Sequence, residues 1–438
     1  MGGWNENYKT YREMAEPLTN YLKEYSFNSV QIMPIMEYPK DATWGYQTMG
    51  YFAPTARYGS PEDLMYLIDY LHDNGIYVLL DWTPAHFDPN EYGLINFDGN
   101  WLYEFPDRRF TTHPVWKTQL FNWNNAYIAS FLISSANFWL SVYNFDGLRV
   151  DTITTLMQLF TLNEKREAAC VEYNKGGIRF CYEFTRALKS QHPNIILVAE
   201  ETQGFCDITA PDKFNFSYKQ GLGWSWDTGS FINKPKENFH CLTKPFGYLY
   251  MNNSVLTYGH DQIAKQNGFL RRQFHESFDK LKTFYSYMIA FPGKKCLFMG
   301  NEYGQSGYWD YTKPLTFITN DDEKYMSWFV QNINKFYLNT PEFYEWDYSP
   351  EGAQVIENNC DGQVLCLMRH CSKGSIMCIF NFSDTDYYDY KINNCNQYRE
   401  IKQVFSSKYM HNSNAHIKDG QLYFNLPANS AFFYRVKN

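Results

Sequence analysis

The sequence lacks the features that mark several common classes of protein. It has no run of 18 apolar residues without a charge, so no segment is expected to span a membrane. The start, Met1-Gly-Gly-Trp4, lacks the basic beginning and apolar middle of a signal peptide. The motifs G-x-x-x-x-G-K, G-x-G-x-x-G and G-x-S-x-G are absent, which argues against a P-loop, a dinucleotide fold and a serine hydrolase. A net charge of −8 argues against nucleic acid as a partner.

The sequence also has no pattern typical of a metal site or a disulfide framework. The ten cysteines include no C-x-x-C pair and no zinc-finger spacing, and the histidines include no H-x-H or H-x-x-x-H pair. We therefore predict no metal and no cofactor. Scattered, reduced thiols are typical of a cytoplasmic protein, which is the location we expect.

The chain is rich in aromatic residues, which are 19% of the sequence, and apolar residues make up 44%. This composition excludes a disordered chain. Two explanations of the aromatic excess remain open. The rings could form stacking platforms for sugars or bases, or they could reflect a compositional habit of the source genome.

Short apolar runs alternate with helical patterns over the first ~340 residues, as in βα units. Continuous runs of this kind predict parallel strands that are buried on both faces. The runs are Ser29–Pro34, Ile76–Asp81, Phe145–Asp151, Ile195–Glu200, Ser254–Tyr258 and Lys295–Gly300. One intervening helix is well marked, with Ser60 as its cap, Pro61 in its first turn and Gly75 at its end. The alternation predicts a TIM-type βα barrel or a doubly wound sheet.

Two segments depart from the alternation. Residues 83–123 form a long polar excursion from the end of one strand, and loops of this size usually build a site. From residue 348 the pattern changes to short alternating strands. We therefore predict a catalytic barrel over residues 1–347 and an antiparallel β-sandwich over residues 348–438.

Acidic residues stand at the ends of four predicted strands. Asp81, Asp151, Glu200 and Asp261 each close or closely follow an apolar run. In a βα barrel the carboxyl ends of the strands form the rim on which active sites are built. One such acid could cap a helix or end a strand by chance, but four on one rim favour a catalytic site.

Arg149 and two histidines accompany these acids. Arg149 lies two residues before Asp151, so both side chains point to the same face of a strand. The cation would keep the carboxylate ionised, as a nucleophile requires, although a structural ion pair inside the barrel would look the same. His86 and His260 lie beside rim acids, where they could bind a polyhydroxylated substrate or simply support the fold. Two carboxylates in distinct environments suit the cleavage of glycosidic bonds best.

These residues also carry a resemblance to the α-amylase superfamily. Four segments resemble its four signatures, in order: Asp81-Trp-Thr-Pro-Ala-His86, Gly147-Leu-Arg-Val-Asp151, Ala199-Glu-Glu-Thr202 and His260-Asp261. Further segments resemble the 1,4-α-glucan branching enzymes of glycogen and starch: Trp44–Gln47, Ala53–Thr55, Phe216–Lys219, Gly223-Trp224 and Gly300–Gln305.

The resemblance implies a retaining double displacement. Asp151 would be the nucleophile, Glu200 the acid and base, and Asp261 a third catalytic carboxylate that stabilises the distorted sugar. Glu201 competes with Glu200 for the acid role, but the signature favours Glu200. The resemblance further implies a substrate-binding set at the cleavage point, in which Tyr46 stacks on the sugar: Tyr46, Asp81, His86, Arg149 and His260.

The implied partner is an α-glucan chain, and the implied reaction transfers a cleaved segment to a 6-hydroxyl to make an α-1,6 branch. Two alternatives remain open: an α-1,4-glucan hydrolase of the same superfamily, and a catalytically impaired glucan-binding protein. The second alternative arises because the first barrel strand is expected to be missing, with only a Gly2-Gly3-Trp4 turn before the first helix near Tyr11. The missing strand predicts either an N-terminally truncated form of a longer protein or an impaired enzyme. Gln262 and Thr202 also depart from the usual signatures, which puts substrate preference in doubt.

Overall fold

The computed structural model describes residues 3–4, 10–163, 165, 167–202, 204–221, 223–393, 395, 397–408 and 412–437. The chain forms two compact units. The first comprises Met1–Leu222 and Tyr311–Pro314, and the second comprises Gly223–Asp310 and Leu315–Asn438. Within the described ranges, no helix is both long enough and apolar enough to cross a membrane.

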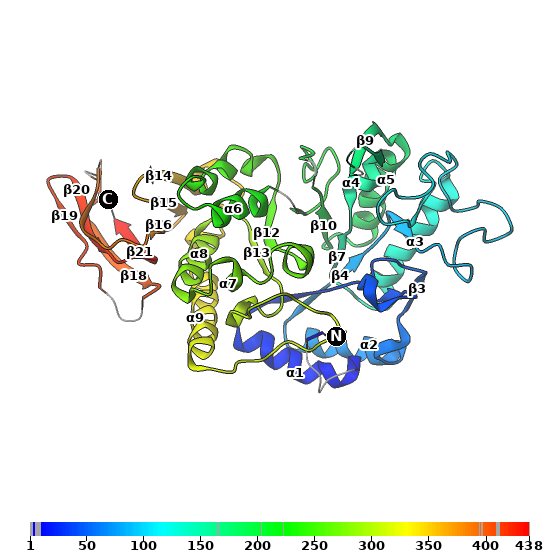
Figure 1. The fold of residues 1–438 in the computed structure, drawn as a ribbon, viewed down its shortest axis with the longest axis horizontal. Helices are drawn as coiled ribbons and strands as arrows, with labels where there is room; N and C mark the ends of the chain where they lie inside the picture. The colour runs from blue at the N-terminus through cyan, green and yellow to red at the C-terminus, as the bar shows by residue number, and fades with distance from the viewer. Residues whose placement is uncertain are drawn as a thin grey trace. The chain divides into compact units, whose positions relative to one another are not determined.

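A sheet of parallel strands forms the centre of the first unit. Its strands run in the order β1-β4-β7-β10-β11, and every pair is parallel. Figure 1 shows β4, β7 and β10 in this sheet. The bounds are β1 (Ser29–Ile32), β4 (Tyr77–Trp82), β7 (Gly147–Val150), β10 (Ile196–Glu200) and β11 (Tyr218–Gln220). Four of these strands were predicted; β11 was not, because Tyr-Lys-Gln is short and polar.

The helices of the first unit are α1 (Tyr11–Glu24), α2 (Pro61–Asp73), α3 (Ala126–Val142), α4 (Ile153–Met157) and α5 (Lys175–Gln191). Helix α2 begins as predicted, because the Ser60 side chain accepts a hydrogen bond from the Asp63 backbone and Pro61 opens the first turn. The left-handed Gly75, with φ of 74°, follows its end. Of the expected Gly2-Gly3-Trp4 turn, Gly2 lies outside the described residues.

Three short antiparallel pairs extend from this unit. They are β2 (Met36–Glu37) with β3 (Gly50–Pro54), β5 (His86–Phe87) with β6 (Gln119–Leu120), and β8 (Gln158–Leu162) with β9 (Ala168–Tyr173). The predicted excursion over residues 83–123 contains β5 and β6 and is otherwise mostly irregular. The β8–β9 hairpin lies in the chain between α4 and α5, on the segment that follows β7.

The second unit contains two more of the predicted parallel strands and a β-sandwich. Strands β12 (Ser254–Tyr258) and β13 (Lys294–Leu297) pair in parallel. The helices are α6 (Trp224–Asn233), α7 (Leu270–Gln273), α8 (Phe278–Ala290) and α9 (Asp321–Leu338).

The sandwich consists of two antiparallel sheets, in the orders β14-β15-β16-β21-β18 and β17-β20-β19. Side chains of both sheets share one buried core, including Met368, Ile379, Phe424 and Phe432. The bounds are β14 (Ala353–Asn359), β15 (Val364–Cys371), β16 (Gly374–Asn381), β17 (Tyr387–Ile392), β18 (Glu400–Ser406), β19 (His416–Lys418), β20 (Gln421–Leu426) and β21 (Ser430–Lys437). The division into functional domains at residue 348 stays a prediction.

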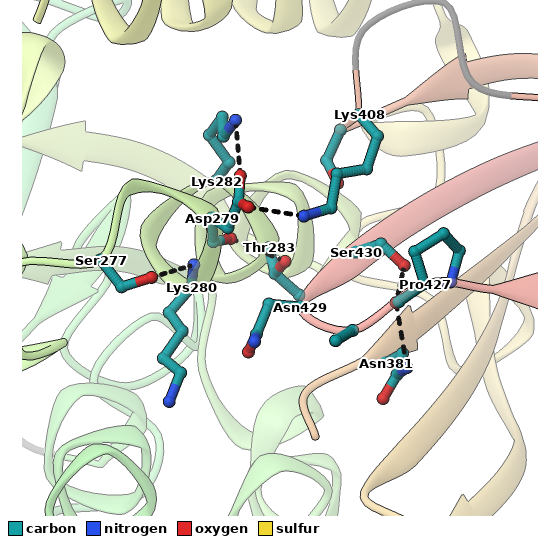
Figure 2. A network of polar contacts seen from close by, with 12 residues as sticks. Ser277, Asp279, Lys280, Lys282, Thr283, Asn381, Lys408, Pro427, Asn429 and Ser430 are labelled. Carbon is teal, nitrogen blue, oxygen red and sulfur yellow. Dashed lines mark hydrogen bonds and ion pairs between the residues drawn. The ribbon is translucent and has the colours of Figure 1, made fainter. Parts of the chain in front are cut away.

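Two polar networks join the sandwich to helix α8 inside the second unit. Figure 2 shows the first, in which the Asp279 carboxylate accepts hydrogen bonds from Lys282 at 2.8 Å and from Lys408 at 2.6 Å. Partial burial opposes the ionisation of Asp279, but the two lysines outweigh it and lower the pKa of this carboxyl.

The second network is fully buried around Arg369 of β15. Its guanidinium donates to the Asp347 carboxylate at 2.8 Å and to the Ala290 carbonyl of α8 at 2.8 Å. Both Arg369 and Asp347 are completely buried.

Replacing Asp347 therefore tests how much the buried ion pair between Arg369 and Asp347 stabilises the second unit. Asp347→Asn leaves the Arg369 cation buried without its counter-charge, so we expect the free energy of unfolding to fall by about 3–5 kcal/mol. Urea unfolding measures this change. The control, Glu400→Gln, removes the partner of an exposed lysine, Lys437, and should leave the urea midpoint where it is. Equal midpoints for both variants would contradict the role given to Arg369.

Candidate active site

A single guanidinium gathers three of the predicted carboxylates. Arg149 Nη1 donates to Asp81 Oδ1 at 2.7 Å and to Asp151 Oδ1 at 2.6 Å. Its Nη2 lies 3.7 Å from Glu200 Oε1. The three acids come from β4, β7 and β10, which are adjacent in the sheet, so the predicted meeting of acids at one rim is observed for these three.

Arg149 stays a cation in this environment. Burial by itself would lower the pKa of Arg149, but the surrounding Asp81, Tyr46, Glu200 and Asp151 outweigh it and raise that pKa well above its usual value. A permanent positive charge between the acids favours the ionised form of each carboxylate. At Asp81 burial outweighs this effect, so the pKa of that carboxyl is raised. The site therefore holds carboxylates ready to act as nucleophile or base.

Tyr46 closes one side of this group. Its hydroxyl donates to Asp81 Oδ2 at 2.6 Å, and the Arg149 guanidinium lies 5.9 Å from the centre of its ring. Burial, followed by the nearby Asp81 charge, raises the pKa of Tyr46 well above its usual value, so the phenol remains a donor. The structure thus joins the predicted Tyr46 to the acids.

The Glu200 carboxylate is fixed by a backbone contact that the sequence did not reveal. The Thr152 N–H donates to Glu200 Oε2 at 2.7 Å. Thr152 follows Asp151 in the chain and adopts a left-handed conformation, with φ of 45°, which a β-branched residue rarely does. Through this turn, the residue after Asp151 holds the Glu200 carboxylate, so the ends of the neighbouring strands β7 and β10 are connected. A main-chain donor leaves no mark in the sequence, which is why it was not predicted.

Glu201 is directed into a separate network. It is completely buried, its Oε2 lies 2.6 Å from Lys219 Nζ, and the same oxygen accepts from the Gly204 and Phe205 backbones at 3.1 Å each. By contrast, the Glu200 side chain is 18% exposed and faces Arg149. The geometry therefore favours Glu200 for chemistry, and Glu201 for fixing the end of β10 and the loop after it. The sequence indicated Lys219 only as part of Phe216–Lys219, one of the segments that resemble branching enzymes.

His86 lies next to a stacked pair of rings, Trp116 and His113. Its ring is 5.0 Å from the ring of Trp116, which stacks on His113 at 3.8 Å. Burial lowers the pKa of His86 to about 3 and that of His113 to about 4, so both are neutral at pH 7. His113 Nδ1 accepts from the Trp116 and Val115 backbones at 3.2 and 3.4 Å, which requires the neutral ring. Trp116 and His113 were not singled out in the sequence beyond the aromatic richness of their segment.

The remaining two predicted residues belong to the second unit. His260 and Asp261 lie two and three residues after the end of β12, and their side chains lie 3.6 Å apart between Nε2 and Oδ2. The Asp261 side chain is well exposed. Among the described residues, no three His, Cys, Asp or Glu side chains are grouped as a metal site would require.

The arrangement has the parts needed for nucleophilic displacement at the anomeric carbon of a sugar. It holds two carboxylates of different exposure beside one cation, Asp151 and Glu200. Retaining glycosidases use such a pair as nucleophile and as acid and base.

Comparison with known proteins shows the family to which the chain belongs. The model of the alpha amylase catalytic domain matches residues 15–93 and 88–352. The chain belongs to the α-amylase family. Its similarity to this family extends to structures: an Anoxybacillus α-amylase aligns over 98% of this chain and 90% of its own with a TM-score of 0.74 and 14% identity. An α-amylase from H. orenii aligns over 98% and 95% with a TM-score of 0.73 and 15% identity. These likenesses confirm the predicted fold class, a βα barrel with a C-terminal β-sandwich.

Within the family, its curated relatives include 1,4-alpha-glucan branching enzymes, as the signatures suggested. The Picrophilus torridus enzyme GlgB is 36% identical over 433 residues, covering 93% of this chain and 59% of the relative. The Aquifex aeolicus GlgB is 34% identical over 436 residues, covering 93% and 69%. This chain therefore spans between half and three quarters of the length of these relatives.

The two neighbouring glutamates should differ in their effect on stability. Glu201→Gln removes the counter-charge of Lys219 at a buried position, so we expect a loss of about 3 kcal/mol in urea unfolding. Glu200→Gln keeps an oxygen for the Thr152 N–H and should unfold close to wild type. The reverse order of stabilities would show that the two side chains have been assigned to the wrong faces of β10.

Stability should also depend on pH through His113. Its pKa is about 4 in the folded protein, below the value of about 6.5 for an unfolded chain, so the unfolded state binds the proton first as the pH falls. Stability is therefore lost as the pH drops from about 6.5 towards 4, by about 3 kcal/mol for this one group.

The variant His113→Asn keeps a hydrogen-bond acceptor and does not titrate, so its unfolding free energy should fall less over the same pH range. Urea unfolding at pH 7 and pH 4.5 measures the difference. Identical pH slopes for the two proteins would mean that folding does not lower the pKa of His113.

Proposed function

We propose that the protein is a retaining glucan branching enzyme that cleaves α-1,4-glucan chains and transfers the segment to a 6-hydroxyl, making the α-1,6 branches of glycogen or starch. The observation that carries the proposal is the clustering of Asp151, Glu200 and Asp81 on Arg149, in a chain about one third identical to branching enzymes. The same cluster would serve hydrolysis, so the choice of acceptor rests on the relatives.

In the first step, Asp151 attacks the anomeric carbon of the donor chain. The bond from that carbon to the glycosidic oxygen breaks, and Glu200 gives its proton to the departing oxygen. The product is a covalent glycosyl ester on Asp151. Arg149 holds the Asp151 carboxylate ionised and in place before the attack.

In the second step, Glu200 takes the proton from the 6-hydroxyl of an acceptor glucan, whose oxygen attacks the same carbon and releases Asp151. Two inversions leave the α configuration unchanged. Tyr46 and Asp81 bind the sugar at the cleavage point, and His86 contacts its hydroxyls. For His260 and Asp261 a substrate-binding role is inferred from the fourth family signature. Asp261 also favours the distorted ring of the transition state.

The partner is accordingly an α-glucan polysaccharide, and the cytoplasm is the location we propose. None of the ten cysteines, all of which belong to the described part of the chain, forms a disulfide, which is consistent with a reducing compartment.

Amylose provides the test of this function. We expect the iodine colour of amylose to fall without a matching rise in reducing ends, and a debranching enzyme should then release short chains from the product. Asp151→Asn should lower the rate by at least about 10⁴-fold, because the covalent step is lost.

Two outcomes would contradict the proposal. A rise in reducing ends equal to the loss of colour would identify a hydrolase. No change in amylose with wild-type protein would favour a catalytically inactive glucan-binding protein. Glu201→Gln, which is predicted to act on stability alone, should retain branching at temperatures where it stays folded.

A further inference from the structure

A buried tyrosine contacts the segment that carries His86 and has no part in the steps described above. Tyr51 lies on strand β3 and is only 2% exposed. Its hydroxyl lies 2.8 Å from the His86 carbonyl oxygen and 3.1 Å from the Thr83 carbonyl oxygen, so its one proton is shared between these two acceptors. The contacts therefore span the turn that leads from β4, which holds Asp81, to β5, which begins at His86.

Tyr51 is itself fixed by helix α3 and its surroundings. Its carbonyl oxygen accepts hydrogen bonds from Ser135 Oγ at 2.8 Å and from Trp139 Nε1 at 3.0 Å, and both donor residues are completely buried. Its ring packs edge-on against Phe121 and Phe131, with ring centres 5.4 and 5.7 Å away. Burial raises the pKa of Tyr51 well above its usual value, so the hydroxyl keeps the proton that it donates. The tyrosine therefore links α3 to the turn before His86.

A second contact holds the same turn beside the segment that carries Tyr46. Thr48 Oγ1 lies 2.6 Å from Thr83 Oγ1. Thr48 follows Tyr46 by two residues, and the Tyr46 hydroxyl donates to the Asp81 carboxylate at 2.6 Å. The two segments are thus joined at Asp81 and again at Thr83, and the hydroxyl of Tyr51 extends this connection to the far end of the turn.

The position of the His86 ring depends strongly on its main chain. Its Nδ1 is buried and, among the described residues, has no hydrogen-bond partner. The ring packs on that of Trp116, with 5.0 Å between the ring centres. A hydrogen bond to one ring nitrogen commonly orients an imidazole, and here that contact is replaced by packing and by the fixed backbone. The Tyr51 hydroxyl is what fixes the carbonyl of this residue.

We propose that Tyr51 is a positioning residue for the reaction, whose hydroxyl holds the His86 carbonyl and thereby places the imidazole against the sugar at the cleavage point. This inference rests on the proposed function and adds a residue that acts through His86 rather than on the sugar. A displaced group lowers the rate even when it is still present, because the transition state requires contacts at fixed distances.

A single substitution removes the contact and keeps the packing. In Tyr51→Phe the ring remains and the His86 turn loses its donor, so with α-maltohexaosyl fluoride as donor we expect kcat/KM for fluoride release to fall about tenfold. Tyr11→Phe is the matched control, because Tyr11 is completely buried and its hydroxyl donates to another main-chain carbonyl, that of Thr55, at 3.1 Å. Both variants should lose similar stability in urea unfolding, but Tyr11→Phe should keep the wild-type kcat/KM.

A double variant shows whether the effect passes through His86. His86→Gln removes the imidazole, so adding Tyr51→Phe to it should cause no further loss of kcat/KM. Additive losses would overturn the proposal, because Tyr51 would then act on something other than His86. A wild-type kcat/KM in Tyr51→Phe alone would overturn it as well.

NMR spectroscopy tests the position of His86 without relying on activity. Because the Trp116 ring is 5.0 Å from the His86 ring, its ring current makes the His86 Cε1–H resonance sensitive to displacement. In protein with carbon-13 at the Cε1 of histidine, His86→Gln identifies this resonance by its loss. We expect Tyr51→Phe to shift the resonance and Tyr11→Phe to leave it in place. An unmoved resonance in Tyr51→Phe would overturn the proposal.

The same experiments separate this proposal from the proposed function. No fluoride release by the wild-type protein would refute the proposed function, while the His86 resonance would still decide whether Tyr51 positions the imidazole. Fluoride release by the wild type, with kcat/KM and resonance both unaffected in Tyr51→Phe, would overturn the role of Tyr51 and leave the proposed function standing.

Discussion

The site depends on the Arg149 guanidinium. A buried cation would be unstable without counter-charges, and here Asp81 and Asp151 contact it at 2.7 and 2.6 Å, with Glu200 at 3.7 Å. The same contacts that stabilise the buried charge also hold the side chains of the acids in place. The chemistry thus follows from an electrostatic requirement of the fold: three parallel strands can bring acids together at their ends only because a cation from one of them lies between.

Glu200 and Glu201, at the end of β10, lie on opposite faces of the strand and make different contacts. Glu200 faces the cation and remains partly accessible, whereas Glu201 is sealed against Lys219 and the backbone of the following loop. Successive residues in a strand point to opposite sides, so Glu200 can face Arg149 while Glu201 anchors the following loop. The anchored loop includes Phe205, whose N–H donates to Glu201.

The sequence predicted the elements that depend on local patterns. Apolar runs located most of the strands, and the positions of Asp81, Asp151 and Glu200 at strand ends predicted their meeting at the rim. The contacts that depend on tertiary structure were not predictable. The Thr152 N–H is a main-chain donor with no sequence signature, β11 has no apolar run, and the partner of Glu201 is brought near only by the pairing of β10 with β11.

Asp151 is proposed to form a covalent bond to the sugar, while Glu200 gives a proton to the departing oxygen and takes one from the acceptor. In Glu200→Gln the fluoride of a glycosyl fluoride can still depart, but the base needed for the second step is gone, so the intermediate should accumulate. Mass spectrometry of proteolytic peptides after reaction with α-maltohexaosyl fluoride measures this directly. The account predicts a maltohexaosyl ester on the peptide containing Asp151. An ester on a different carboxylate, or fluoride release without any adduct, would contradict it.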